Sequence, residues 1–246
     1  METAAILAKM GCDAPERTVI DASAYGPWFR MMFRETTRTN EQLGTRDIGS
    51  LNLEAAIGLP GAENQNLDAC VQTLNAWAKH LRVYTQGHWR LFQCSPERYD
   101  FSRGQFLMLA LVTFLQKRLG IHYNLPFNKG DYDATDSRNL FLHGILAGRG
   151  GTCVTMALLY IAVGRRLGYP LYLVRTKEHF FARWDEEGGE RFNIECTSPG
   201  FSPRDDEYYR QWPKPLTTDD LGLGIFLRNL RPREELRHSL FNGRAA

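Results

Sequence analysis

Residues 147–170, AGRGGTCVTMALLYIAVGRRLGYP, place a glycine-rich turn, a cysteine and a long apolar run in direct succession. Thr152 is a favourable N-cap, because its hydroxyl can accept a hydrogen bond from a free amide of the first helical turn. Gly168 and Pro170 follow the apolar run and predict where it ends. The stretch therefore predicts a central, buried helix whose first residue is Cys153.

A cysteine at the first position of a helix differs chemically from one in a helix interior. The unpaired N–H groups and the positive end of the helix dipole stabilise a thiolate there, and the thiolate is the nucleophilic form. Glycines at 150 and 151 leave room for a substrate chain, and the amides of this turn could bind an oxyanion. Cysteine is also a common inert core residue, so a catalytic interpretation requires a base elsewhere in the chain.

A predicted hairpin supplies that base. Residues 179–197, HFFARWDEEGGERFNIECT, have the alternation of two strands joined by a turn centred on Glu187. We expect a register that pairs His179 with Glu195, which places both of them and Asn193 on one face. The other face then carries the apolar residues Phe180, Ala182, Trp184, Phe192 and Ile194.

A thiol at a helix start, a histidine and a carboxylate meet the requirements for a nucleophile, its base and a group that orients the base. An ordinary polar contact between His179 and Glu195 is the alternative. A zinc site at Cys153, His179 and Cys196 is disfavoured, because Cys196 points to the opposite strand face and no fourth ligand is evident. The expected catalytic residues are Cys153, His179 and Glu195, with Gly151, Thr152, Asn139 and Asn193 as candidate substrate or oxyanion contacts.

Helical patterns precede Cys153 and strand patterns follow it, which predicts an α+β fold. Apolar residues recur at spacings of three and four over residues 66–84, and a capping box opens a second helix over 102–119. Three short strands are expected over residues 169–176, 179–185 and 191–197. Shorter helices are expected over 137–146, 203–212 and 232–241, with mixed loop and short helix over 15–65.

The composition excludes several classes of protein. The chain of 246 residues is 43% hydrophobic and has a formal net charge of +2, so it can bury a core and is not expected to bind nucleic acid. Its longest apolar run, residues 106–115, is about half of the roughly 20 residues that cross a bilayer, so no membrane contact is expected. Five dispersed cysteines without a C-x-x-C pair, and an N-terminus unlike a secretory signal, favour the reducing cytoplasm.

Three blocks of the sequence resemble the transglutaminase-like superfamily, and most closely its SirB1-type bacterial branch: GRGGTCVTMALLYIAVGRRLGYPL (148–171), KEHFFARW (177–184) and RFNIECTSPGF (191–201). The resemblance covers about residues 120–201. It implies a papain-like core in which the cysteine-bearing helix packs on a small antiparallel sheet. It also implies a nucleophile at Cys153, a base at His179 and an orienting acid at Glu195, although the superfamily usually has Asp at the last position.

These observations predict a helical N-terminal region at residues 1–119, a catalytic core at 120–201 and a helical extension at 202–246. The expected function is cysteine-dependent acyl transfer, either hydrolysis or transamidation of an amide in a peptide or protein substrate, with no metal or organic cofactor. The alternative is a non-catalytic module of the same fold that binds a protein partner or acts as a scaffold.

Overall fold

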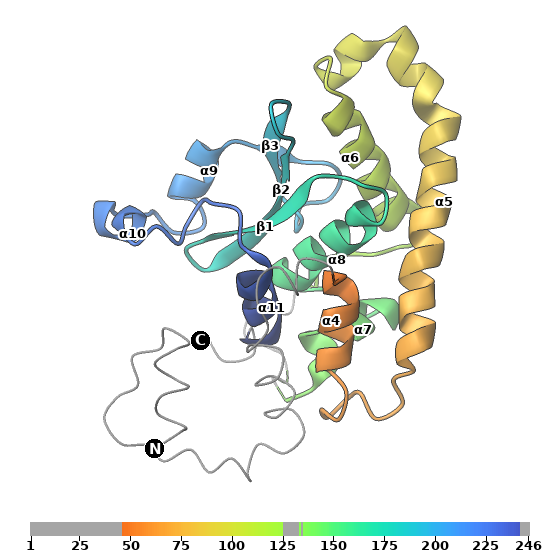
Figure 1. Cartoon of the computed structure of the whole chain (residues 1–246), viewed down its shortest axis with the longest axis vertical. Coiled ribbons are helices and arrows are strands. Elements are labelled where there is room, and N and C mark those ends of the chain that lie inside the picture. Colours follow the sequence, from red (N-terminus) through yellow and green to blue (C-terminus); the bar gives the residue numbers. More distant parts are fainter. Residues whose placement is uncertain (1–45, 125–132, 134, 242–246) are drawn as a thin grey trace.

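The computed structural model describes residues 46–124, 133 and 135–241. Its centre is helix α8 (Cys153–Arg165), which packs on a four-stranded antiparallel sheet on one side and on helices from the first half of the chain on the other (Figure 1). From Met156 to Val163 every side chain of this helix is fully buried. The predicted α+β fold and the central position of the cysteine-bearing helix are thus confirmed.

The helices before the cysteine are α4 (Ile48–Ala55), α5 (Leu67–Cys94), α6 (Arg103–Thr113) and α7 (Leu142–Leu146), with single turns η2 (Pro96–Tyr99), η3 (Phe114–Arg118) and η5 (Ser137–Asn139). Asn66 caps α5 and Ser102 caps α6, because each side chain accepts a hydrogen bond from the amide three residues later. The long helix α5 continues beyond the predicted end at residue 84. Its added turns carry Trp89 and Phe92, whose rings pack on Phe106.

The sheet has the order β1 (Leu171–Thr176), β2 (His179–Asp185), β3 (Arg191–Ile194) and β4 (Pro203–Arg204). The predicted register between β2 and β3 is wrong by two residues, because Arg183, not Phe181, pairs with Asn193. The turn is centred on Gly188, whose φ is +68°, and not on Glu187 as predicted. A shift of two residues leaves every side chain on its predicted face, since side chains alternate with a period of two.

The two faces of the sheet pack against different parts of the chain. The face toward α8 contributes Leu173, Ala182 and Trp184 to the main core. The opposite face is covered by α9 (Asp206–Gln211), where the Tyr209 ring stacks on the Phe181 ring with 3.7 Å between centroids. Helix α9 therefore closes the side of the sheet that carries His179.

The rest of the C-terminal part forms α10 (Thr218–Gly222) and α11 (Pro232–Phe241). Helix α10 was not predicted, because its five residues are too few for a periodic pattern. Most of the mixed region expected over residues 15–65, and the N-terminus with Cys12, lie outside the described residues, and α4 falls in the described part. None of the described helices is long and apolar enough to cross a bilayer.

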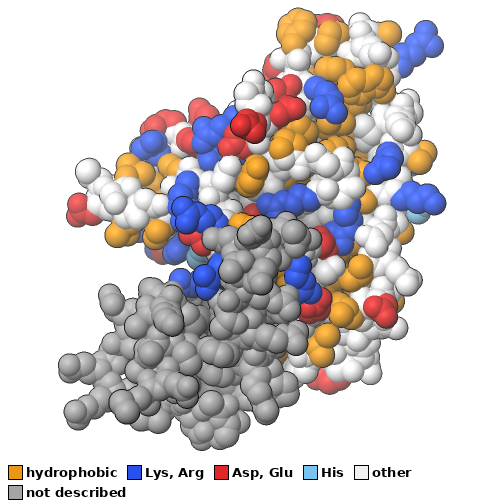
Figure 2. All heavy atoms as spheres, viewed as in Figure 1, with side chains coloured by type: hydrophobic (Ala, Val, Ile, Leu, Met, Phe, Trp, Pro, Cys, Tyr) orange, Lys and Arg blue, Asp and Glu red, His pale blue; other side chains and the backbone are white. Residues whose placement is uncertain are grey.

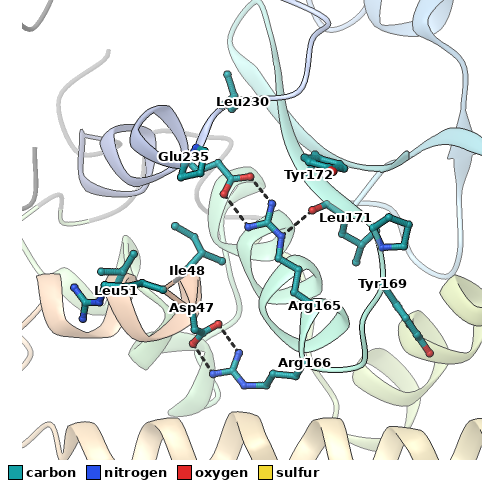
Figure 3. A pocket seen from close by; sticks show the side chains of 13 residues that line it. Asp47, Ile48, Leu51, Arg165, Arg166, Tyr169, Leu171, Tyr172, Leu230 and Glu235 are labelled. Carbon is teal, nitrogen blue, oxygen red and sulfur yellow. Dashed lines mark hydrogen bonds and ion pairs between the residues drawn. The ribbon is translucent and has the colours of Figure 1, made fainter. Parts of the chain in front are cut away.

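Two ion pairs fix the C-terminal end of α8 (Figure 3). Arg165 binds Glu235 of α11 through both terminal nitrogens, and Arg166 binds Asp47 at the start of α4 in the same way. A hollow of about 450 Å³ lies between these pairs. It is at the opposite end of α8 from Cys153, so we do not assign it to the candidate active site.

Charged side chains of both signs are interspersed over the face shown in Figure 2. Hydrophobic side chains gather at the end where α5 meets α6. Leu91 and Phe101 are the large exposed residues of this end, with 55% and 73% of their surface accessible.

Candidate active site

Cys153 is the first residue of α8, as the sequence predicts, and its side chain is a free, partly exposed thiol. The start of the helix is fixed by two bonds between Thr152 and Thr155. The Thr152 hydroxyl accepts from the Thr155 amide at 3.2 Å, and the Thr155 hydroxyl accepts from the Thr152 amide at 2.7 Å. This reciprocal cap holds the thiol at the positive end of a buried helix.

The turn before Cys153 is held by residues that precede it in the chain. The Gly151 amide donates to the His122 carbonyl at 3.0 Å, and the Asn124 amide donates to the Gly151 carbonyl at 2.9 Å. The amides of Gly151 and Thr152 are therefore already engaged, which corrects the expectation that they bind an oxyanion. The Cys153 amide belongs to the first turn, whose N–H groups have no partner within the helix.

His179 is the first residue of β2 and faces a carboxylate. Its Nε2 atom lies 2.9 Å from Oε2 of Glu195, and the two side chains are 7% and 2% exposed. Burial alone would lower the pKa of His179, but interactions with the Cys153 thiol and with Glu195 outweigh burial and raise this pKa to about 9. Because Nε2 is engaged by the acid, Nδ1 is the ring nitrogen left for the thiol.

Glu195 follows β3 directly and has a hydrogen-bond partner on each side. Oε1 accepts from the amide and the hydroxyl of Thr197 at 2.9 and 2.6 Å, and Oε2 accepts from the Tyr209 hydroxyl at 3.0 Å as well as from His179. Burial would raise the pKa of Glu195, but the bonds from His179 and Thr197 lower it below its usual value. The carboxylate is thus kept ionised although it is buried.

The two residues meet diagonally rather than face to face. When the pairing of β2 and β3 is continued by one residue, Phe181, not His179, lies opposite Glu195. His179 itself pairs with Thr176 of β1. Diagonal neighbours on one face of a sheet remain within reach of long side chains. The wrong register therefore still predicted the right contact.

Aromatic side chains from the α9 region enclose the histidine. Trp212 packs edge-on against the His179 ring with 4.6 Å between centroids, and the Tyr209 ring lies parallel to it at 6.3 Å. Tyr123 is close enough to Cys153 and Glu195 for their charges to act on it, and burial together with these two groups raises the pKa of Tyr123 to about 12. Aromatic side chains from two separate segments of the chain therefore lie near the site.

Sequence reasoning missed Thr197, Tyr209, Trp212 and Tyr123. Thr197 had a local signal, since a threonine two residues after an acid can bind its carboxylate. The three aromatic residues had none, because each comes from a segment that meets the site only through tertiary folding.

The two candidate asparagines lie elsewhere. Asn193 is 2% exposed and is held between Arg183 and Asp206, with bonds of 2.6 and 2.8 Å. The Asn139 side chain donates to the Asp133 carbonyl at 2.8 Å. Both are engaged in structural contacts, which corrects the expectation that they contact substrate or an oxyanion.

Cys196 points away from the candidate site. It is fully buried in the main core, and its thiol donates to the Ile194 carbonyl at 3.3 Å. No group of three His, Cys, Asp or Glu side chains within the described ranges is arranged to hold a metal ion.

A free thiol at a helix start, beside a buried imidazole and carboxylate, is the arrangement expected of a cysteine nucleophile with its base. The family model of the transglutaminase-like superfamily matches residues 67–223, well over half of the chain. The chain belongs to this superfamily.

Among curated proteins, the chain is similar to F-box only protein 21. It is 38% identical to the mouse protein and 36% identical to the human protein, in each case over 64 residues. The aligned segment is 26% of this chain and only 10% of each relative, so the chain matches about a tenth of their length. No solved structure matches the chain significantly.

Proposed function

We propose that the protein is a cysteine-dependent acyl-transfer enzyme that acts on an amide in a peptide or protein substrate. The observation that carries this proposal is the buried pair of His179 and Glu195, whose imidazole also interacts with the Cys153 thiol. A cysteine that only fills the core needs no charged group beside it. Burying a charged pair such as His179 and Glu195 costs free energy unless every polar atom of the pair is hydrogen-bonded. We assign the nucleophile to Cys153, the base to His179 and the orienting acid to Glu195.

The proposed reaction follows from these positions. His179 Nδ1 takes the thiol proton, and Cys153 Sγ attacks the amide carbon to form a tetrahedral intermediate. The imidazolium gives its proton to the leaving amine, which breaks the C–N bond and leaves a thioester. Water or a second amine then attacks the thioester, with His179 again as base, and releases the acid or the new amide. Glu195 keeps its charge throughout and holds Nε2–H.

The oxyanion of each intermediate needs a donor close to the sulfur. The amide of Cys153 is in the free first turn of α8, whereas the amides of Gly151 and Thr152 are bonded. We therefore assign the oxyanion contact to the Cys153 amide and to the positive end of the helix.

Two finer assignments, the branch of the superfamily and the domain division, rest on the sequence, and a third concerns the cellular compartment. The amino-acid sequence of the three blocks supports the SirB1-type branch of the superfamily. The division at residues 119/120 and 201/202 stays a prediction, and the family match crosses both positions. We place the enzyme in the reducing cytoplasm, because a nucleophilic thiol must stay reduced and Cys70, Cys94, Cys153 and Cys196 are all free.

A non-catalytic, protein-binding role is the second candidate function. The exposed side chains of Leu91 and Phe101, at the end where α5 meets α6, favour it, because clustered exposed apolar residues often mark protein contacts. Catalysis requires a reactive thiol at Cys153, whereas protein binding does not.

Alkylation of the cysteines by iodoacetamide, followed by peptide mass analysis, tests the proposal. Cys94 is an exposed free thiol in the same chain and serves as the internal reference. We expect Cys153 to react faster than Cys94 near pH 7, and His179→Gln to remove this difference. Equal rates at the two cysteines in the unmodified protein would favour the binding module.

A further inference from the structure

Helix α5 runs along one edge of the described part of the chain, and only one of its sides is buried (Figure 1). Leu74, Ala78, Leu81 and Thr85 form the buried side. Six residues at spacings of three or four lie on the opposite side, and all six are exposed. We call them the outer stripe: Ala76, His80, Val83, Gly87, Leu91 and Cys94.

The outer stripe has an unusual composition for a side that faces solvent. Such a side normally carries charged residues, but the stripe contains no Asp, Glu, Lys or Arg. Val83 and Leu91 are 64% and 55% exposed. Single exposed apolar residues are ordinary on a protein surface, whereas these two are aligned on one side of one helix. The stripe is therefore suited to contact another protein surface.

Gly87 lies at the centre line of the stripe, between Val83 and Leu91. A Cβ atom at Gly87 would meet no neighbouring group within 4 Å, so the packing of the described chain does not require glycine here. Glycine inside a helix costs about 1 kcal/mol relative to alanine. The missing side chain leaves a notch between two larger side chains, into which a second helix can pack closely. A helix partner thus accounts for a glycine that the fold itself does not explain.

The two edges of the stripe differ in charge, which selects the orientation of a second copy. Lys79 and Arg90 stand exposed along one edge, and the half-buried indole of Trp77 lies along the other. In an antiparallel pair related by a two-fold axis, the two cationic edges would meet and repel each other. In a parallel pair, Lys79 of one copy meets the Trp77 edge of the second copy, where a cation and an aromatic face attract each other.

The length of α5 is sufficient for a weak dimer. A helix of 28 residues is about 42 Å long and about 12 Å wide, so two copies that meet along it bury on the order of 1,000 Å² in total. That area is near the lower limit for a specific interface, so the dimer should form only at high protein concentration. The stripe itself carries no ion of Asp, Glu, Lys or Arg that would have to leave water.

We propose that the outer stripe of α5 is the contact surface between two copies of this chain, which pack in parallel about a two-fold axis along the helix. Gly87 then faces Gly87 of the second copy, and Cys94 faces Cys94. The stripe lies on the side of α5 that faces away from the core, so the dimer does not depend on the proposed function of Cys153.

Sedimentation velocity from about 5 to about 500 µM protein tests the dimer, because this range brackets the affinity of a weak complex. We expect the unmodified protein to shift from monomer to dimer. Gly87→Lys fills the notch with a charged side chain and should raise the dissociation constant at least about tenfold. Gln93→Lys is the matched control, because it adds the same charge at an exposed position of α5 outside the stripe, and should change the constant less than about threefold.

Gly87→Ala separates the interface from the stability of the helix. Alanine should raise the free energy of unfolding by about 1 kcal/mol and yet weaken the dimer, because its methyl group occupies the notch. Circular dichroism and urea unfolding confirm that each variant is folded. A dimer that is as strong in Gly87→Ala and Gly87→Lys as in the unmodified protein uses another surface and overturns the proposal.

Oxidation by copper phenanthroline in air tests the orientation. In the parallel pair, the two Cys94 thiols lie near the axis and should form an intermolecular disulfide, which peptide mass analysis identifies. The link should form at least about tenfold more slowly in Gly87→Lys and at an unchanged rate in Gln93→Lys. A dimer that forms no such link is not parallel and overturns the arrangement.

Two further outcomes would overturn the proposal. One is a protein that stays monomeric at the highest concentration, which would leave the stripe to a different partner. The other is a dimer that weakens about tenfold between about 50 and about 500 mM salt, because ion pairs and not the uncharged stripe would then hold it. The alkylation comparison of Cys153 with Cys94 is made at the dilute end, where Cys94 is free, so it fails or succeeds independently.

Discussion

The Nε2 atom of His179 lies 2.9 Å from Oε2 of Glu195, although the two residues are not paired across β2 and β3. The contact is diagonal and is completed by Thr197 and Tyr209, which bind the remaining lone pairs of the carboxylate. A buried acid with all its acceptor positions occupied can hold an imidazolium without becoming protonated itself.

Glu195→Gln keeps the size of the side chain and removes its charge. The pKa of His179 should fall toward its ordinary value, because the imidazolium loses its partner. Alkylation of Cys153 by iodoacetamide near pH 7 should slow on the order of tenfold, which corresponds to about one pKa unit of stabilisation. Peptide mass analysis against Cys94 measures this, and an unchanged rate would remove Glu195 from the site.

Asn193→Ala is the control for this substitution. The residue is as buried as Glu195 but bonds to Arg183 and Asp206. We expect it to lower the free energy of unfolding by about 1–3 kcal/mol, because it leaves the buried Nε–H of Arg183 without its acceptor. The rate at Cys153 should stay within about twofold in the folded protein.

Two histidines, His179 of the candidate site and His238 of α11, should titrate on opposite sides of the ordinary range. NMR of the ring protons should show His179 changing near pH 9 and His238 near pH 4, with single His→Gln variants giving the assignments. The His179 shift also predicts a sign for stability: its contribution is fully present below the unfolded pKa of about 6.5 and is lost as the pH rises through about 9. Urea unfolding should therefore show the advantage over Glu195→Gln shrinking across this interval.

Thr152→Ala removes the hydroxyl that caps α8. The Thr155 amide then loses its partner at the buried start of the helix, and we expect a loss of about 1 kcal/mol in the free energy of unfolding. Thr152→Ser keeps the hydroxyl and should cost less. Urea titration of both variants tests the cap, and equal losses would show that the methyl group matters instead.

Glu190 ties the tip of the hairpin to the start of α6. Its carboxylate accepts from the Ser102 hydroxyl at 2.6 Å and from the amides of Arg103 and Gly104 at 2.9 and 2.7 Å. Glu190→Ala should cost about 2 kcal/mol, because charge-assisted bonds at a helix N-terminus are lost. Glu187→Ala, at an exposed position of the same turn, should cost almost nothing. Cys153 should alkylate at the same rate in both variants.

The sequence by itself determined the features that depend on neighbours along the chain. The cap at Thr152 and the apolar run placed Cys153 at the start of a buried helix, and the alternation after His179 placed it on the same face as Glu195. These features follow from local hydrogen bonding and from fixed periods of 3.6 and 2 residues, which the order of residues alone reveals.

Tertiary structure decided the features that depend on distant segments. The turn around Gly188 moved the register by two residues, and the contacts of α9 brought Tyr209 and Trp212 to His179. The hydrogen bond from the Gly151 amide to the His122 carbonyl is not predicted by any local pattern of the sequence. Such contacts are chosen by packing and by the need to pair buried polar groups, so they arise only when the whole chain has folded.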